Sequence, residues 1–210
     1  YFGTNMAKQN IKLSILILSI PSRIRFLEKL MSNLEKQIGN RQDVEILSLM
    51  DNKSYNVSDK RNAMLALARG THLTWIDDDD DVANSYIEKI TDAIEKNPMV
   101  DVISFDQQCY LDGIPAKVFA KMGNPHQDAI LDPTTGAYKD ILRPPYHWCV
   151  WRSELAKSEH FRFGVFMPGS HVGEDIDWLK RLYPKVKDSV YLEGEQLHIY
   201  TYSKEISESK

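Results

Sequence analysis

The sequence has few cysteines and no long hydrophobic run, and each absence excludes a class of protein. Cys109 and Cys149 are the two cysteines of the 210 residues. They are too few for a disulfide framework or a cysteine-ligated metal cluster, so we expect reduced thiols and a cytoplasmic location. The longest apolar stretch, Ile15–Ile20, is far shorter than the ~20 residues of a membrane helix. The sequence therefore predicts no transmembrane segment.

Positive charge is not in excess either. The formal net charge is −4, so a general electrostatic attraction to nucleic acid or anionic membrane is excluded. A local basic strip such as 180–187 can still contact phosphates. A hydrophobic content of 42% and a charged content of 27% are typical of a globular domain. Residues 1–5 look like a cloning or protease-site remnant before Met6. We expect a single domain over 6–210.

The first half alternates between short apolar runs and amphipathic helical patterns. The apolar runs predict strands at 12–19, 44–50, 71–76 and 100–105, and the periodic segments predict helices at 23–37, 58–69 and 86–96. Pro21 opens the first helix, and Gly70 is expected to end the second. This alternation predicts a mainly parallel sheet with right-handed crossovers.

The second half has a mixed pattern. Residues 107–121 predict a hairpin that turns at Asp112-Gly113, and the four prolines of 123–145 predict a loop. A strand is expected at 146–152, a short helix at 153–158, a helix at 174–182, and one or two closing strands at 189–202. The glycine-rich segment 164–173 is expected to be mobile. There is no repeat or low-complexity linker, so we expect this half to extend the same sheet.

Polar side chains follow the ends of the first three predicted strands. Five consecutive aspartates, Asp77–Asp81, follow the third strand, Asp51 and Asn52 follow the second, and 19–23 follow the first. Because the carboxyl ends of parallel strands meet at one edge, these groups should share a crevice. Clustered carboxylates repel one another unless they are neutralised, and their hard oxygens suit Mg²⁺ or Mn²⁺. The alternative is a solvated acidic turn before a helix.

Three further groups have both a functional and a structural interpretation. Lys60 and Arg61 begin a helix, where cations and N–H groups suit an anion, but they also suit a solvated surface. Glu174 and Asp175 begin another helix, where a carboxylate is either a general base or part of a cap. His147 and His198 are structural residues or contacts to metal or phosphate.

Taken together, these segments resemble the family-2-type, inverting nucleotide-sugar glycosyltransferases of the GT-A fold. Residues 14–23 are similar to the family's first strand and donor loop, and Asp51 stands where the family places its base-binding aspartate. Residues 58–70 resemble the family's "KRN" helix, 75–80 its Asp-x-Asp-Asp strand end, and 173–175 the Glu-Asp pair that carries the catalytic base. The resemblance covers about 12–105 well and 146–202 more loosely.

The resemblance implies an α/β fold: a single GT-A (Rossmann-like) domain with a mostly parallel central sheet, helices on both faces and a mixed antiparallel C-terminal part. It assigns nucleotide-sugar binding to 12–105, and acceptor binding and the catalytic base to 106–210. It also implies a nucleoside-diphosphate sugar donor, with a UDP-sugar favoured, Mn²⁺ or Mg²⁺, and displacement with inversion. The acceptor would be a hydroxyl of a glycan, a lipid-linked sugar, a protein or a modified phage DNA base, in the cytoplasm of a bacterium or a phage-infected host.

The resemblance also implies roles for single residues. Asp175 would be the base, with Glu174 the second choice, and Asp79 would ligate the metal with help from Asp77 and His198. The donor would be bound by residues from the three strand ends and one helix: Pro21, Ser22, Arg23, Asp51, Asn52, Lys60, Arg61, Asp77 and Asp78.

Two departures and two alternatives accompany this interpretation. The family's Thr-Tyr-Asn after the first proline is shortened to Ser22-Arg23, which leaves the nucleobase-stacking group unassigned, and the run of aspartates leaves its register open by one residue. A nucleotidyltransferase also uses paired aspartates and a metal, but no glycine-rich phosphate loop follows the first strand. The other alternative is a non-catalytic sugar- or nucleotide-binding module with an acidic metal loop.

Overall fold

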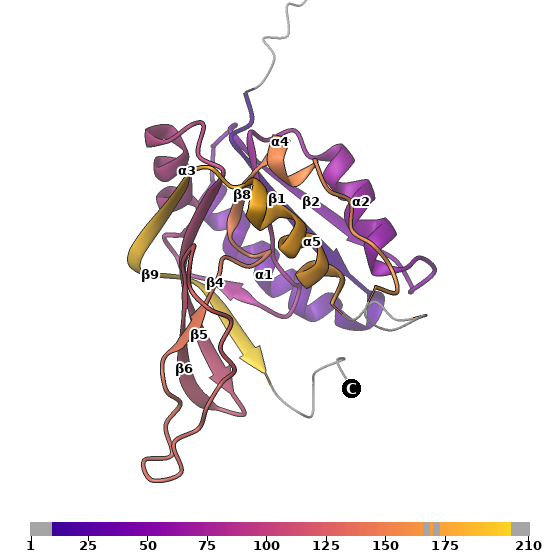
Figure 1. Ribbon diagram of the computed structural model, residues 1–210. Coiled ribbons are helices and arrows are strands. Elements are labelled where there is room, and N and C mark those ends of the chain that lie inside the picture. Colours follow the sequence, from indigo (N-terminus) through magenta and orange to yellow (C-terminus); the bar gives the residue numbers. More distant parts are fainter. Residues whose placement is uncertain (1–9, 166–168, 170–172, 203–210) are drawn as a thin grey trace, which may run out of the picture.

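The structure, a computed structural model, describes residues 10–165, 169 and 173–202. Its central layer is one mixed sheet, in which the strands lie in the order β2-β1-β3-β8-β5-β6-β7, and β9 pairs with both β5 and β4 (Figure 1). The first-half elements are β1 (Leu13–Ser19), η1 (Pro21–Arg23), α1 (Ile24–Ile38), β2 (Val44–Met50), α2 (Val57–Leu67), β3 (His72–Trp75), β4 (Asp81–Val82) and α3 (Tyr86–Lys96). The second-half elements are β5 (Val102–Leu111), β6 (Ile114–Ala120), β7 (Ile141–Arg143), β8 (Val150–Arg152), α4 (Ser153–Ala156), α5 (Glu174–Leu182), η2 (Tyr183–Lys185) and β9 (Ser189–Tyr202).

Helices cover both faces of the sheet, as predicted. α1 and α3 contact each other on one face, while α2, α4 and α5 lie on the other (Figure 1). The central strand β1 is therefore buried along almost its whole length, and Leu13, Ile15, Leu16 and Ile17 are fully buried. A strand that is covered on both faces reads as a continuous apolar run rather than an alternating one, which explains the sequence of 13–18.

The first-half predictions are confirmed, with two corrections. β2 and α3 have the predicted bounds, and β1 pairs in parallel with both β2 and β3. The first correction is that α2 ends at Leu67, so Gly70 is not its C-cap. A Cβ on Gly70 would lie 2.7 Å from His72 O and 2.7 Å from Ser14 N. Glycine is needed there because the backbone of 70–72 lies close to β1 at Ser14, and not because the helix ends there.

The second correction adds a strand between β3 and β5 to the predicted order. β8 pairs antiparallel with β3 through Leu73↔Trp151 and antiparallel with β5 through Val102↔Trp151. β5 therefore runs parallel to β3, but the two strands are not neighbours. The order of elements in the sequence does not reveal this insertion, because β8 comes from a later part of the chain than β5.

In the second half, β5 and β6 form the predicted hairpin, which turns at Asp112-Gly113, and α5 has the predicted bounds. The strand predicted at 146–152 is limited to β8, because Cys149 N donates to Tyr146 O and closes a turn there. The loop predicted at 123–145 contains the short strand β7. β9 is one strand that pairs in parallel with β5, with register shifts around Asp106. Residues 1–5 and most of 164–173 lie outside the described residues.

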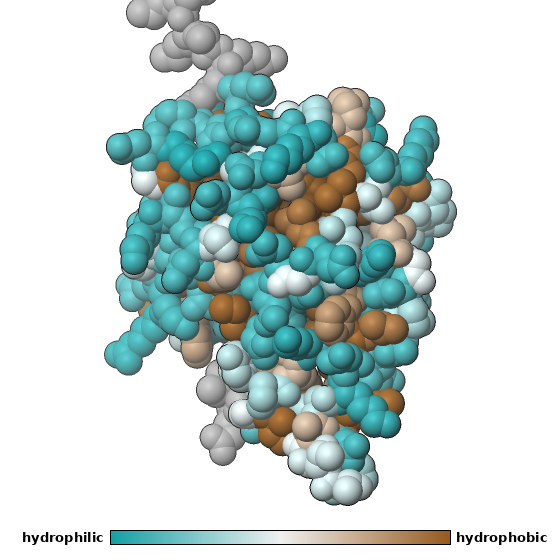
Figure 2. Space-filling view, turned by 90° about the vertical axis from the view of Figure 1, so that its left-hand side faces the viewer, coloured by the Kyte–Doolittle hydropathy of each residue, from teal (hydrophilic) through white to brown (hydrophobic). Residues whose placement is uncertain are grey.

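The surface is predominantly hydrophilic on the side that Figure 2 shows, with hydrophobic residues in separated patches. Within the described residues, no helix combines the length and apolarity that a membrane crossing needs. The buried apolar side chains instead form one core, and Trp75, Trp151 and Trp178 are its largest fully buried members.

Candidate functional site

The three strand ends meet at one edge of the sheet, as the sequence predicts. The parallel register pairs Ser19 with Met50, and the backbone N–H of Asp51 donates to Ser19 O over 3.4 Å. The hydroxyl of Ser19 also donates to Asp78 Oδ2 over 2.6 Å. A single buried serine thus links the end of β1 to the aspartates that follow β3.

The side chains of the aspartate run point in different directions. Arg23 contacts both Asp78, with Nη2 2.9 Å from Oδ1, and Asp79. Burial raises the pKa of Asp78, and the Ser19 hydroxyl and Arg23 oppose that shift. Asp81 turns toward α1, where Asn33 donates to Oδ1 over 2.8 Å and Lys29 Nζ lies 2.9 Å from Oδ2. Asp81 therefore has a structural role and is not part of the crevice.

His147 joins Asp77 to Asp175. Its Nδ1 lies 3.0 Å from Asp175 Oδ2, and its Nε2 lies 3.8 Å from Asp77 Oδ2. Burial would lower the pKa of His147, but the two carboxylates outweigh it and raise the pKa to about 9. Burial alone would raise the pKa values of Asp77 and Asp175. The neighbouring His147 outweighs this effect, so both pKa values are lowered. Both carboxylates are therefore ionised next to an imidazolium near neutral pH.

Asp80 and His198 form a second, buried pair. His198 Nε2 lies 3.2 Å from Asp80 Oδ2, and burial raises the pKa of Asp80 to about 6 against the lowering effect of His198. The thiol of Cys109 donates to Gln107 Oε1, which orients the Gln107 amide so that its NH₂ group faces His198 Nδ1 over 2.8 Å. The two ring nitrogens of His198 therefore face Gln107 on one side and Asp80 on the other.

Arg61 lies between the two halves of the site. Its Nε is 3.3 Å from Glu174 Oε1 and its Nη2 is 3.7 Å from Asp77 Oδ1. The guanidinium also lies over the rings of Trp75, at 4.8 Å, and Phe161, at 5.4 Å. Burial raises the pKa of Glu174, and Arg61 opposes the shift. Glu174 is thus a buried ion-pair partner, whereas Asp175 is accessible.

Asp51 and Lys60 form an ion pair at the end of β2. Lys60 Nζ lies 2.6 Å from Asp51 Oδ1, and the backbone N–H of Tyr55 donates to Oδ2 over 3.1 Å. The Lys60 contact is the main reason that the pKa of Asp51 is lowered. Asn52 accepts a hydrogen bond from Ser54 and is exposed. Pro21 and Ser22 are exposed in η1.

A cavity of about 350 Å³ lies at the junction of the two halves. Asp77, His147 and Asp175 line it together, and Asp80 is also in its wall. The remainder of its lining comes from the second half: Gln107, Cys109, Leu111, Val118, Ala129, Ile141, Arg143, Tyr146, Trp148 and Tyr200. Two aspartates after β3, Asp77 and Asp80, therefore open into the same space as Asp175 of α5, as a reaction between two bound molecules requires.

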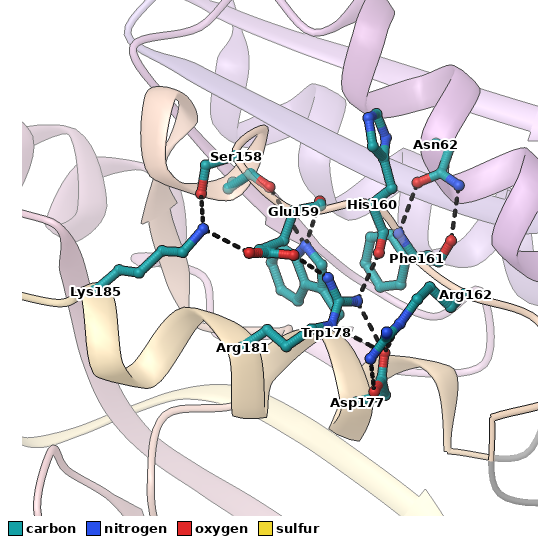
Figure 3. Close-up of polar contacts among 11 residues, drawn as sticks. Asn62, Ser158, Glu159, His160, Phe161, Arg162, Asp177, Trp178, Arg181 and Lys185 are labelled. Atoms are coloured by element: carbon teal, nitrogen blue, oxygen red, sulfur yellow. Dashed lines mark hydrogen bonds and ion pairs between the residues drawn. The ribbon is translucent and has the colours of Figure 1, made fainter.

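The start of α5 is held in place by contacts with the segment 158–162 (Figure 3). Asp177 accepts two hydrogen bonds from Arg162, at 3.0 and 2.6 Å, and it also pairs with Arg181. Asn62 of α2 forms two hydrogen bonds with the backbone of Phe161, at 2.9 and 2.8 Å. Asp175 is thus fixed relative to α2 through side chains remote from the cavity.

The predicted metal ligands have separate protein partners. Asp79 contacts Arg23, Asp77 contacts Arg61 and His147, and His198 faces Asp80. In the part of the chain that the structure describes, no three His, Cys, Asp or Glu side chains are grouped closely enough to hold a metal ion. Beside the aspartate run, the buried Asp80 Oδ1 makes no hydrogen bond among the described residues, whereas His198 Nε2 lies 3.2 Å from Asp80 Oδ2.

Several site residues carry no signal in the sequence. Gln107, Arg143 and Trp148 lie on strands or loops of the second half, and only the pairing of β5, β7 and β9 brings them to the cavity. His147 is an isolated histidine in the sequence, and nothing in its surroundings indicates that it bridges Asp77 and Asp175. No local pattern could have revealed these contacts, because each joins segments about 30 to 100 residues apart.

Comparison with known proteins supports the fold. No model of a protein family and no curated protein matches the sequence. Solved structures of TarS from S. aureus do match. TarS 1-349 matches with a TM-score of 0.60 and 14% sequence identity. Its complex with UDP has a TM-score of 0.62 and 14% identity, and its complex with UDP-GlcNAc has a TM-score of 0.61 and 12% identity. These matches cover 91 or 92% of this chain but only 59 to 61% of the TarS chains. The chain has the same Rossmann-like GT-A fold as these structures, which confirms the predicted fold class.

Proposed function

We propose that this protein is a nucleotide-sugar glycosyltransferase that moves a sugar from a nucleoside diphosphate, with UDP favoured, to an acceptor hydroxyl. The observation that carries the proposal is the cavity shared by Asp77, His147 and Asp175, where the carboxyl ends of the parallel strands meet an accessible carboxylate of α5. The fold adds support, because the TarS structures of the same fold include complexes with UDP and UDP-GlcNAc.

The donor would lie along the ends of β1, β2 and β3. Asp51 offers carboxylate oxygens for the nucleobase or ribose, while Lys60 and Arg23 offer positive charge for the diphosphate. Pro21, Ser22 and Asn52 are exposed beside them, and Asp78 holds Arg23 in place. Arg61, which contacts Asp77, supplies a third cation between donor and acceptor. Such positioning of both reactants accounts for much of enzymatic rate enhancement.

Asp175 is the stronger candidate for the base. It lines the cavity and its pKa is lowered, so it is a carboxylate at neutral pH, whereas Glu174 is directed to Arg61. In a single displacement with inversion, the acceptor oxygen bonds to the anomeric carbon and the bond from that carbon to the diphosphate oxygen breaks. The hydroxyl proton passes to the Asp175 carboxylate. His147 would orient Asp175 as it does in the structure.

The chemistry of the acidic residues fits Mn²⁺ or Mg²⁺. Asp79 and Asp77 offer hard oxygen ligands and His198 offers an imidazole, while the buried Asp80 Oδ1 makes no hydrogen bond among the described residues. A bound divalent cation would offset the charge that develops on the leaving diphosphate. The residues of this chain would have to exchange partners to bind it, because Arg23 contacts Asp79.

A thermal-shift screen of UDP, GDP, CDP, TDP and ADP, each with and without Mn²⁺, tests this proposal. A ligand at 100 times its Kd adds about 2.7 kcal/mol to stability, which corresponds to about 5–10 °C for a chain of this size. We expect a Mn²⁺-dependent shift with one nucleotide, lost in Asp79→Ala and kept in the matched control Asp92→Ala, which changes an exposed aspartate of α3. No shift with any nucleotide at millimolar concentration would overturn the proposal and favour a binding module with an acidic loop.

A further inference from the structure

A second cavity, of about 550 Å³, adjoins the first. It is lined by His126, Pro144, Tyr146, Gly173, Ile176, Leu179, Lys180 and Tyr183. Tyr146 lines both cavities and is therefore the residue at their boundary. A ligand longer than one sugar that reaches Asp175 in the first cavity would extend toward Tyr146, which lines that cavity too.

Arg143 stands beside Tyr146 and lines the first cavity. Its guanidinium lies 5.8 Å from the centre of the Tyr146 ring, and its Nη1 contacts the Tyr146 hydroxyl over 3.3 Å and the His126 ring. Among the described residues, no carboxylate pairs with Arg143, and its Nε and Nη2 make no hydrogen bond to protein. The other arginines of the site, Arg23 and Arg61, both pair with carboxylates.

Two further basic groups, His126 and Lys180, lie near Arg143, although carboxylates line the same cavity. The pKa of His126 is lowered first by burial and then by the charges of Arg143 and Lys180. The carboxylate next to His126, Asp128, lies 3.9 Å away and is 93% exposed. A half-buried guanidinium that keeps free donors and is paired with no carboxylate among the described residues is a suitable partner for a phosphate or carboxylate, which it can bind through two parallel hydrogen bonds.

We propose that the acceptor carries an anionic group, a phosphate or a carboxylate, and that Arg143 binds it where the two cavities meet. This inference rests on the proposed glycosyl transfer. The donor diphosphate is a less suitable partner for Arg143. Arg143 is on β7, and the donor residue Asp51 follows β2. These two strands are at opposite ends of the sheet order. Arg143 therefore selects the acceptor, while Asp175 accepts its proton.

The test measures binding of four probes by isothermal titration, with UDP and Mn²⁺ at saturation and at constant ionic strength. The probes are methyl glucoside, glucose 6-phosphate, glucuronate and inorganic phosphate. The variants are Arg143→Gln, Arg143→Lys and the matched control Lys117→Gln, in which Lys117 is exposed on β6 beside Val118 of the cavity wall. Hydrogen bonds to charged groups are worth about 1.5–3 kcal/mol, or about tenfold or more in affinity.

We expect glucose 6-phosphate, glucuronate or both to bind the wild-type protein at least about tenfold more tightly than methyl glucoside. The preference should be lost in Arg143→Gln, partly kept in Arg143→Lys and unchanged in Lys117→Gln. Which of the two acidic sugars binds identifies the anionic group. Equal affinities for neutral and acidic sugars, an unaltered preference in Arg143→Gln, or inorganic phosphate binding as tightly as the sugars would each overturn the inference. Absence of UDP binding in the same titrations would instead count against the proposed function, so the two failures are distinguishable.

Discussion

The imidazole of His147 lies between two carboxylates from opposite halves of the chain, with Nδ1 3.0 Å from Asp175 and Nε2 3.8 Å from Asp77. Asp77 follows β3, and Asp175 lies in the first turn of α5. The histidine therefore fixes the spacing between the aspartate run and the candidate base. A partner that orients a reacting or ligating group in this way contributes to activity without touching substrate.

Replacing His147 should impair turnover more than donor binding. In His147→Gln we expect kcat for sugar transfer to fall about ten- to hundredfold, as for other residues that orient reacting or ligating groups, while the Kd for UDP stays within about twofold. Steady-state kinetics and titration with UDP measure the two quantities. His160→Gln, which changes an exposed histidine, is the control and should leave both unchanged. An unaltered kcat in His147→Gln would show that the histidine has no positioning role.

The two candidate bases should respond differently to loss of charge. Asp175→Asn should reduce transfer about 10²–10⁴-fold, the usual range for general base catalysis, with UDP binding intact. Glu174→Gln should instead lower the free energy of unfolding by about 1–3 kcal/mol, because it weakens the buried pair with Arg61. Denaturant unfolding and kinetics on both variants separate these effects. The reverse pattern would assign the base to Glu174.

Arg23 should compete with a divalent cation for Asp79. Its guanidinium contacts Asp78 and Asp79, and like charges close together repel. Arg23→Gln should therefore bind Mn²⁺ at least about threefold more tightly in the absence of nucleotide. Titration calorimetry gives the Kd, and Arg25→Gln, which removes an exposed charge from the first turn of α1, two residues along the chain, is the control. Weaker Mn²⁺ binding in Arg23→Gln would contradict the assignment of the metal to Asp79.

Gly70 should not tolerate a side chain. A Cβ there would lie 2.7 Å from two backbone atoms, which cannot move as a flexible side chain can. Gly70→Ala should therefore destabilise the protein by about 1–3 kcal/mol, the cost of overpacking a buried site. Urea unfolding measures the change. A neutral substitution would mean that β1 and the segment before β3 can separate at little cost.

Local sequence patterns predicted where helices and strands occur better than they predicted which strands pair in the sheet. The bounds of β2, α3 and α5 follow from apolar runs and helical periodicity, and these features depend on residues a few positions apart. β8 is a three-residue strand placed between β3 and β5 by pairing with both. Such pairing depends on the whole chain, so the order of elements in the sequence did not reveal that β8 is the neighbour of β3.

The same limit applies to the site. The sequence predicted that Asp51 and the aspartate run would come close to Ser19, because the carboxyl ends of parallel strands meet. The sequence could not show which partner each of the five aspartates contacts. The direction of each side chain depends on the turn after β3, in which Asp80 N donates to Asp77 O. The role of each predicted metal and donor ligand stays a prediction.

The most direct test of the central claim is a measurement of UDP release from UDP-sugars with Mn²⁺, in the wild-type protein and in Asp175→Asn, with UDP binding measured in parallel. The account predicts metal-stimulated release with at least one UDP-sugar, and its loss in Asp175→Asn while that variant still binds UDP. Equal release by both proteins, or UDP binding without release from any UDP-sugar, would contradict the claim that the cavity of Asp77, His147 and Asp175 transfers sugar.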